Sequence, residues 1–348
     1  MFQHFFVPLD GSARAEKAIP VAARLAQACG GTVIFARVLV PPSGADEYGA
    51  NVLANETRLV QAEIVDEART YLDEMLVRYA QALAGIHHLV AEVAPGHVPS
   101  TLFELAEREQ SDLIVMCSRG DNWLKRSLVG SVTQATFRHS PLPVLALSEH
   151  GNTLFLEGGP LRILVPLDGE AAAETVLEPV FQLLALVTAP MPHRVHLLQI
   201  IATPAASGHF RNAAPITDAL QQEECQRAEQ ALKALAGRLA SSNPLAARCA
   251  IISSVVINPD VAGTIVKHSQ AITEDGAPSY DLVALATHGR TGIRRALMGS
   301  VTEHVFGATS LPLLVVHPPL PRSYEQETTE EKAGQTHEEI PRSWVGLL

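Results

Sequence analysis

Two short segments, each built around a pair of glycines, hold residue types that bind anions. In both, a glycine follows an apolar run of strand length, and nine residues separate it from a Gly-Ser pair that opens a helical pattern. A glycine lets a ligand approach the backbone, and the first amides of a helix are unpaired donors at the positive end of its dipole. These segments therefore predict two phosphate-binding loops. The residues are Gly120, Gly130 and Ser131 in the first and Gly289, Gly299 and Ser300 in the second.

Basic side chains gather in both segments, although the chain carries a formal charge of −11. They are Arg119, Lys125 and Arg126 in the first segment and Arg290, Arg294 and Arg295 in the second. This local positive charge favours anion binding. Alternatives stay open for single residues: Arg126 and Arg295 face a ligand or lie on solvated surface, and His288 contacts phosphate or only fills the loop.

The two segments belong to a longer internal duplication. Residues Asp112 to Leu147 and Asp281 to Val316 align without a gap at a shift of 169 residues, and both contain Gly-Ser-Val-Thr and Leu-Pro. The pentapeptide Val-Pro-Leu-Asp-Gly occurs at Val7 and again at Val165. Each long copy has the pattern of a strand, a loop, a helix and a second strand. The chain is therefore predicted to contain the same fold twice.

The elements that must position these loops alternate along each half. Five apolar runs and four stretches of helical periodicity predict a parallel, doubly wound α/β sheet in each half. The helix after the first strand contains Pro20, and we expect a bend there. The predicted boundaries are a first domain at 1–150, a linker at 151–160, a second domain at 161–318 and a disordered acidic tail at 319–348.

Length and composition fit two globular domains. The chain has 348 residues, 47% of them hydrophobic and 18% charged, and its acidic balance argues against nucleic acid as the main partner. We expect no membrane span and no signal peptide. Four cysteines show no Cys-x-x-Cys pairing, so a reducing cytoplasm is the expected setting. His193 and His196 have a spacing that places them on opposite faces of a strand, so no metal site is predicted.

An aspartate follows the first strand of each half. In a doubly wound sheet, ligands bind beyond the carboxyl ends of the strands where the winding reverses, which places Asp10 and Asp168 beside the glycine loops. A carboxylate there can accept hydrogen bonds from a ribose or a base, so adenosine and its phosphates suit the site. The alternative is that each aspartate only caps the next helix, and that each Gly-Ser-Val-Thr is only a helix start.

The order and spacing of these motifs resemble the universal stress protein family, in a tandem form that covers all but the tail. The resemblance implies a Rossmann-like sheet with strand order 3-2-1-4-5 and a stress-response protein that binds ATP, with or without Mg²⁺. By position, the aspartates would meet the adenosine, and Val38 and Ile200 would contact the base. The other implied contacts are Pro8, Gly120, Gly130, Ser131 and Val132 in the first half, and Pro166, Thr287, His288, Gly289, Arg290, Gly299, Ser300 and Val301 in the second.

The two halves depart from the family pattern to different degrees. The family's ATP-binding form has a further glycine three residues before each counted one, where this chain has Cys117 and Ala286. Alanine is the smaller change, and Asp121 adds a negative charge to the first loop. We therefore expect the second domain to bind ATP and the first to bind it weakly or not at all.

Catalysis has little support in the sequence. No Gly-Lys-Ser/Thr phosphate loop, His-Glu-x-x-His or Gly-x-Ser-x-Gly motif occurs, so no catalytic residue is assigned. A nucleotide-dependent binding or regulatory protein is the favoured function. The alternatives are slow ATP hydrolysis in the second domain and a dimerising interaction module that binds no nucleotide.

The last strand of each half is unusually apolar. Leu-Pro-Val-Leu-Ala-Leu and Leu-Pro-Leu-Leu-Val-Val would leave a hydrophobic edge strand, which needs a partner. We therefore expect strand five of one half to face strand five of the other in an internal pseudo-dimer. A homodimer and unidentified protein partners are further expectations.

Overall fold

The structure is a computed structural model of the whole chain. It describes residues 1–39, 53–84, 88–95, 97–117, 131–147, 155, 158–202, 218–274, 276–287 and 300–318. Both glycine loops, the predicted acidic tail and most of the predicted linker lie outside these residues. Val40 to Val52 and the loop before the second long helix lie outside them as well.

The first half contains five strands and their connecting helices. Its strands are β1 (His4–Pro8), β2 (Thr32–Leu39), β3 (His88–Pro95), β4 (Leu113–Cys117) and β5 (Val144–Leu147). Its helices are the 3₁₀ turn η1 (Ala15–Lys17), α1 (Ala18–Cys29), α2 (Leu53–Arg78), α3 (Ala80–Leu83), α4 (Val98–Arg108) and α5 (Ser131–His139). The predicted long helix therefore begins earlier than expected and is interrupted at Tyr79.

The second half repeats this order. Its strands are β6 (Arg162–Leu167), β7 (Arg194–Ile201), β8 (Ala250–Ile257), β9 (Leu282–Ala286) and β10 (Leu313–Val316). Its helices are α7 (Ala171–Glu174), α8 (Leu177–Ala185), α9 (Asp218–Ser242), η2 (Ala246–Arg248), α10 (Val261–Ser269) and α11 (Ser300–Ala308). The start of the run expected as the third strand forms η2 instead, so β8 begins at Ala250.

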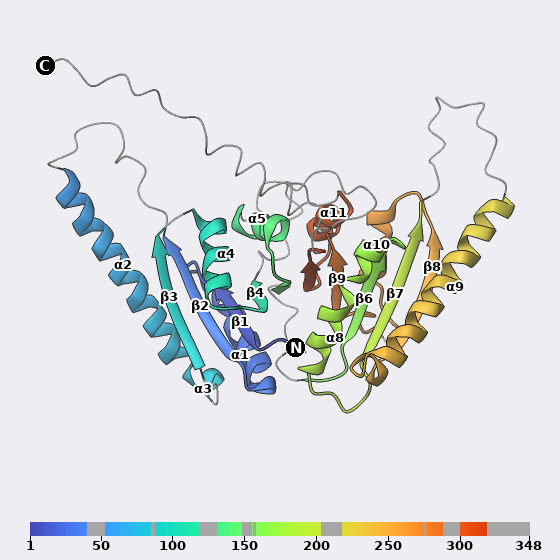
Figure 1. Cartoon of the computed structure of the whole chain (residues 1–348), viewed down its shortest axis with the longest axis horizontal. Helices are drawn as coiled ribbons and strands as arrows, with labels where there is room; N and C mark the ends of the chain where they lie inside the picture. The colour runs from blue at the N-terminus through green and yellow to red at the C-terminus, as the bar shows by residue number, and fades with distance from the viewer. Residues whose placement is uncertain are drawn as a thin grey trace, which may run out of the picture. The chain divides into compact units, whose positions relative to one another are not determined.

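All ten strands form one sheet, in the order β3-β2-β1-β4-β5-β10-β9-β6-β7-β8 (Figure 1). Each half therefore has the order 3-2-1-4-5, and within each half every pairing is parallel. The halves meet where β5 pairs with β10 in an antiparallel arrangement, with Leu145 opposite Leu314. The predicted partner of strand five is thus the other strand five.

Pro20 does not bend a helix, contrary to the expectation. The chain first makes η1, and α1 then begins at Ala18, so Pro20 is its third residue. Amides in the first turn of a helix have no partner within that helix, so proline is tolerated there. The second half has the same arrangement, because Pro179 is the third residue of α8 and lies in its first turn.

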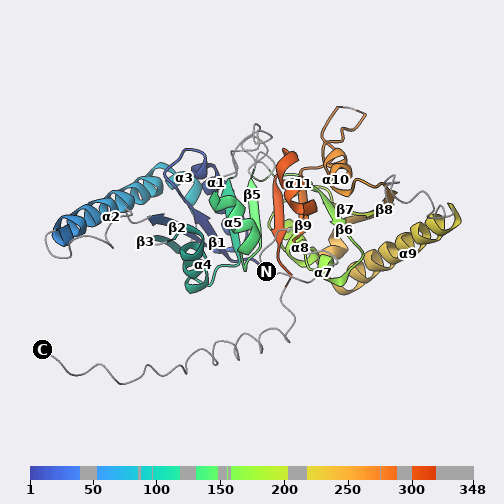
Figure 2. The ribbon, with the colours of Figure 1, turned by 90° about the horizontal axis from the view of Figure 1, so that it is seen from above.

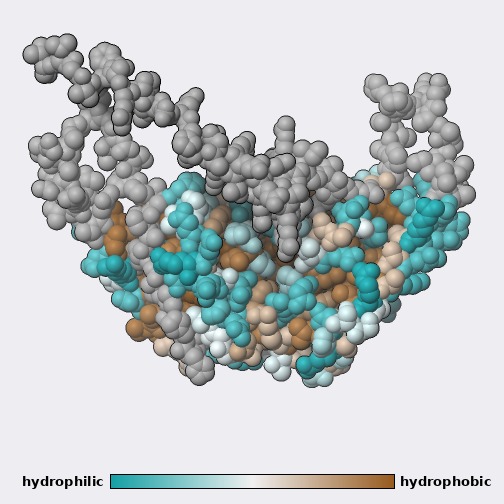
Figure 3. All heavy atoms as spheres, viewed as in Figure 1, coloured by the Kyte–Doolittle hydropathy of each residue, from teal (hydrophilic) through white to brown (hydrophobic). Residues whose placement is uncertain are grey.

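Helices cover both faces of the sheet (Figure 2). One core layer contains Phe5, Phe35 and Leu145 with residues of α1, α2, α8 and α9, and the other contains Phe6, Phe137 and Val144 with residues of α4, α5, α10 and α11. The outward face of α9 is hydrophilic (Figure 3). Within the described part of the chain, no helix combines the length and the hydrophobicity of a membrane span.

Candidate functional site

A pocket lies at the carboxyl ends of β1, β2 and β4, where the winding of the first half reverses. Its volume is about 360 Å³, and its lining comes from β1 and the following turn, β2, α4, β4 and α5. Four residues predicted from the sequence line it together: Pro8, Asp10, Val38 and Val132. Val38 and Val132 pack on the core layer beneath α4 and α5, so the pocket has an apolar wall. The position is the one that doubly wound sheets use for ligands.

Asp10 lines this pocket and stabilises the turn that follows β1. Its Oδ1 accepts a hydrogen bond from the Ser12 amide at 2.9 Å, and the Ser12 hydroxyl accepts one from the Ala15 amide at 3.2 Å. The bond to Asp10 closes the turn itself and is not a helix cap, because η1 begins later, at Ala15, and its N-cap residue Arg14 makes no side-chain cap bond. The same oxygen pattern recurs in the second half, where Asp168 accepts from the Glu170 amide at 3.0 Å.

The predicted residues of the second half occupy the equivalent positions. Pro166 lies in β6, Asp168 directly after it, and Ile200 near the end of β7. Thr287 follows β9 and is buried, with its amide donating to the Val316 carbonyl at 3.0 Å. Ser300 and Val301 begin α11, as Ser131 and Val132 begin α5. The remaining predicted contacts, Gly120, Gly130, His288, Gly289, Arg290 and Gly299, lie outside the described residues.

Sequence analysis missed two cations of the first-half pocket, Arg14 and Arg37. Arg37 lies against Gly11, whose φ of +87° lets the turn pass so close that an added Cβ would lie 3.3 Å from the Arg37 Nη2. Its guanidinium carbon is 4.7 Å from the centre of the Tyr71 ring, so the cation stacks on an aromatic face. Comparing the halves position by position would have drawn attention to Arg37, because its counterpart is Gln199. Gln199 lies 2.9 Å from an added Cβ on Gly169.

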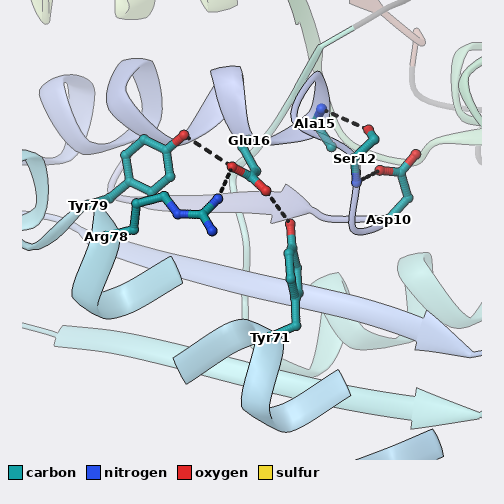
Figure 4. Close-up of polar contacts among 7 residues, drawn as sticks. All are labelled: Asp10, Ser12, Ala15, Glu16, Tyr71, Arg78 and Tyr79. Carbon is teal, nitrogen blue, oxygen red and sulfur yellow. Dashed lines mark hydrogen bonds and ion pairs between the residues drawn. The ribbon is translucent and has the colours of Figure 1, made fainter. Parts of the chain in front are cut away.

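Tyr71 is itself held by a buried carboxylate (Figure 4). Glu16 is 6% exposed and accepts hydrogen bonds from the Tyr71 hydroxyl at 3.3 Å, from Arg78 at 2.8 Å and from the Tyr79 hydroxyl at 3.4 Å. Burial raises the pKa of Tyr71, and the charge of Glu16 and the hydrogen bond to it raise the pKa further. The Tyr71 phenol therefore stays protonated at neutral pH and donates its hydrogen bond to Glu16.

The second half keeps the ion pair of this cluster but not the tyrosines. Glu174, the counterpart of Glu16, accepts from Arg238 at 3.0 Å, and its side chain is 39% exposed. Tyr71 and Tyr79 correspond to Ala231 and Leu239 on α9. The cluster that supports Arg37 is thus complete in the first half alone.

Cysteine and histidine side chains are the remaining candidates for chemistry. Among the described residues, no group of three histidine, cysteine or acidic side chains could hold a metal ion. All four cysteines lie within the described residues and none forms a disulfide. Cys117 is partly exposed and lines the pocket. The ring nitrogens of His193 and His196 both have hydrogen-bond partners, which are separate for the two residues.

Fold and site together define a tandem, doubly wound α/β protein with a pocket at the switch point of its first sheet half. The sequence profile named "Universal stress protein family" matches residues 1–148 and 161–317. The chain belongs to the universal stress protein family and contains its domain twice.

Individual relatives agree with this assignment. A universal stress protein of Mycolicibacterium smegmatis is 26% identical over 323 residues, which cover 90% of this chain and 96% of that protein. A shorter one from Thermus aquaticus is 28% identical over 145 residues, 42% of this chain and 98% of that protein. Among solved structures, a universal stress protein from Archaeoglobus fulgidus has a TM-score of 0.55 at 16% identity and covers 90% of this chain and 96% of its own. At 16% identity, the similarity to the Archaeoglobus protein is a similarity of fold alone.

Proposed function

We propose that this protein binds adenine nucleotide at the carboxyl edge of the sheet and acts in stress response as a nucleotide-dependent binding or regulatory protein. The observation that carries the proposal is the first-half pocket. Its volume of about 360 Å³ falls in the range of roughly 300–1,000 Å³ typical of small-molecule sites. It joins an apolar wall for a base, an aspartate for a ribose and the first turn of α5 for phosphate.

The two glycine loops differ in the residues that would contact phosphate. Arg290 and His288 favour triphosphate binding in the second loop, whereas Asp121 and Cys117 weaken it in the first. We therefore propose ATP, with or without Mg²⁺, as the ligand of the second half. Four cysteines without a disulfide fit a reducing cytoplasm as the place of action.

Mass spectrometry of small molecules released from freshly purified protein tests the proposal. Wild type should release ATP, and Gly289→Val and Gly299→Val should abolish the release of ATP, because a side chain blocks the approach of phosphate to the backbone. Gly120→Val is the matched control in the first loop and should leave the ATP of the second half in place. If no nucleotide is released and added ATP does not bind, the loops are structural and the proposal fails.

A further inference from the structure

The two halves present different charges where their first two strands end. Three residues of the first-half pocket, Ser12, Arg14 and Arg37, correspond to Glu170, Ala172 and Gln199 in the second half. The first half therefore gains two cations, and the second gains one carboxylate instead. Among the described residues, no carboxylate forms an ion pair with Arg37. The opposite charges at the ends of the first two strands favour different ligands in the two halves.

Side chains of α2 and η1 fix the position of Arg37. Its guanidinium stacks on Tyr71, and the Tyr71 hydroxyl donates to the buried Glu16. Arg78 and the Tyr79 hydroxyl bind the same carboxylate and fix it (Figure 4). A cation whose position is fixed by a second layer of side chains loses less conformational entropy when an anion binds. This arrangement is that of a binding residue supported by its neighbours.

The place of Arg37 in the pocket shows which part of a nucleotide it would meet. Successive residues of a strand point to opposite faces, so Arg37 stacks on Tyr71 of α2, whereas Val38 packs on the core beneath α4 and α5. The first turn of α5, where a phosphate chain would sit, follows β4, and β1 separates β4 from β2. The Arg37 guanidinium itself lies against Gly11, directly after Asp10, and Asp10 is the residue that the proposed function assigns to the ribose.

We propose that the first-half pocket selects a nucleotide with an anionic group on its ribose, in addition to the 5′-phosphate, and that Arg37 binds this group. The inference rests on the proposed function, because it assumes that a nucleotide occupies the edge of the sheet. An arginine fork matches the oxygens of a phosphate, and a nearby arginine is a general device for a ribose phosphate in doubly wound folds. The second half, with Gln199 and Glu170, rejects the same group.

Isothermal titration calorimetry with three probes tests this: AMP, adenosine 2′,5′-bisphosphate and adenosine 3′,5′-bisphosphate. Wild type should bind one of the bisphosphates more tightly than AMP by on the order of tenfold, at one site per chain. Arg37→Gln, which places the second-half residue in the first half, should remove this preference, so that neither bisphosphate binds more tightly than AMP. The double variant Glu170→Ser/Gln199→Arg should create a second site with the same preference.

The outcomes separate the two proposals. A wild type that binds AMP and both bisphosphates equally, a preference that survives Arg37→Gln, or a double variant that gains no preference overturns the role of Arg37 and leaves nucleotide binding intact. Absence of binding for all three probes and for ATP overturns the proposed function and this inference with it. Thermal unfolding of each variant verifies that it is folded, and the native glutamine at the equivalent position makes Arg37→Gln a mild change.

Discussion

At the residue scale, the carboxylate of Glu16 is buried, whereas that of its counterpart Glu174 is exposed. Replacing Glu16 by glutamine keeps its shape but removes the charge that binds Arg78, Tyr71 and Tyr79. We expect Glu16→Gln to lower the free energy of unfolding by about 1–3 kcal/mol, because hydrogen bonds to charged groups are the stronger ones. Urea unfolding followed by circular dichroism measures the change.

The second half provides the matched control. Glu174 has one ion-pair partner, Arg238, and both side chains are well exposed to solvent. Glu174→Gln should therefore cost less than about 1 kcal/mol. Equal losses in the two variants would mean that the tyrosines add nothing to the first-half cluster.

His196 makes the second half sensitive to acid. Its ring is buried, with Nδ1 2.5 Å from the Tyr280 hydroxyl and Nε2 2.7 Å from the Ser254 hydroxyl. Burial, with a smaller contribution from the nearby His268 and Arg194, lowers the pKa of His196 to about 4. In the unfolded chain the pKa is about 6.5, so protons bind the unfolded state first. This residue's stabilisation is complete above pH 6.5 and is lost as the pH falls towards 4.

The His196→Gln variant isolates this effect, because glutamine can hydrogen-bond but does not titrate. Between pH 7 and pH 5, wild type should lose about 1–2 kcal/mol more of its free energy of unfolding than the variant. His193, whose pKa burial also lowers, is present in both proteins, so its share cancels. Parallel pH dependences in urea unfolding would contradict the assignment.

At the residue scale, the sequence located the carboxyl edge of the sheet but not Arg37. Asp10 follows from the motif order, because a parallel sheet brings its carboxyl ends to one edge, and Val38 and Val132 are implied by the resemblance to the family. Arg37 does not follow, since an arginine near a strand end is usually solvated surface. Its meaning depends on Tyr71, which is 34 residues away in sequence on a different helix.

At the scale of elements, the alternation of apolar runs and helical periodicity predicted the strands and a parallel sheet in each half, whereas the strand order came from the resemblance to the family. The failures lie at element starts. Pro20 was expected to bend a helix that in fact begins two residues earlier, and Ala246 to Arg248 form a 3₁₀ turn in place of the expected start of a strand. Both outcomes depend on local hydrogen bonding, which the pattern of hydrophobic residues does not encode.

Helices α5 and α11 bring equivalent residues of the two halves together. The rings of Phe137 and Phe306 meet edge to face, with centres 4.2 Å apart and planes at 89°, and both side chains are buried. Double-mutant cycles with Phe137→Leu and Phe306→Leu should give a coupling energy of about 0.5–1.5 kcal/mol. Phe137→Leu combined with Phe181→Leu is the control and should be additive, because Phe181 lies in the other core layer. A zero coupling for the first pair would refute the contact.

At the scale of the molecule, the two halves share one continuous sheet. The antiparallel pair β5 and β10 continues one sheet from half to half, and Arg138 binds Glu303 across the junction at 3.1 Å. Burying these two strands against each other covers the apolar edges that the sequence predicted. The junction therefore belongs to the folded unit, and disrupting it should affect both halves at once.

Charged residues at the centre of this junction provide the sharpest test of that statement. Leu145 and Leu314 lie opposite each other in register, and neither side chain is accessible to solvent. Aspartate at both positions would place two like charges face to face in the core, so we expect Leu145→Asp/Leu314→Asp to lower the free energy of unfolding by more than about 4 kcal/mol. The variant should also bind a hydrophobic dye, because the two strand edges become exposed. Leu145→Met/Leu314→Met conserves volume and should cost less than about 1.5 kcal/mol per site. A charged variant that stays soluble, binds no dye and unfolds at the urea concentration of wild type would show that the two halves do not depend on this pairing.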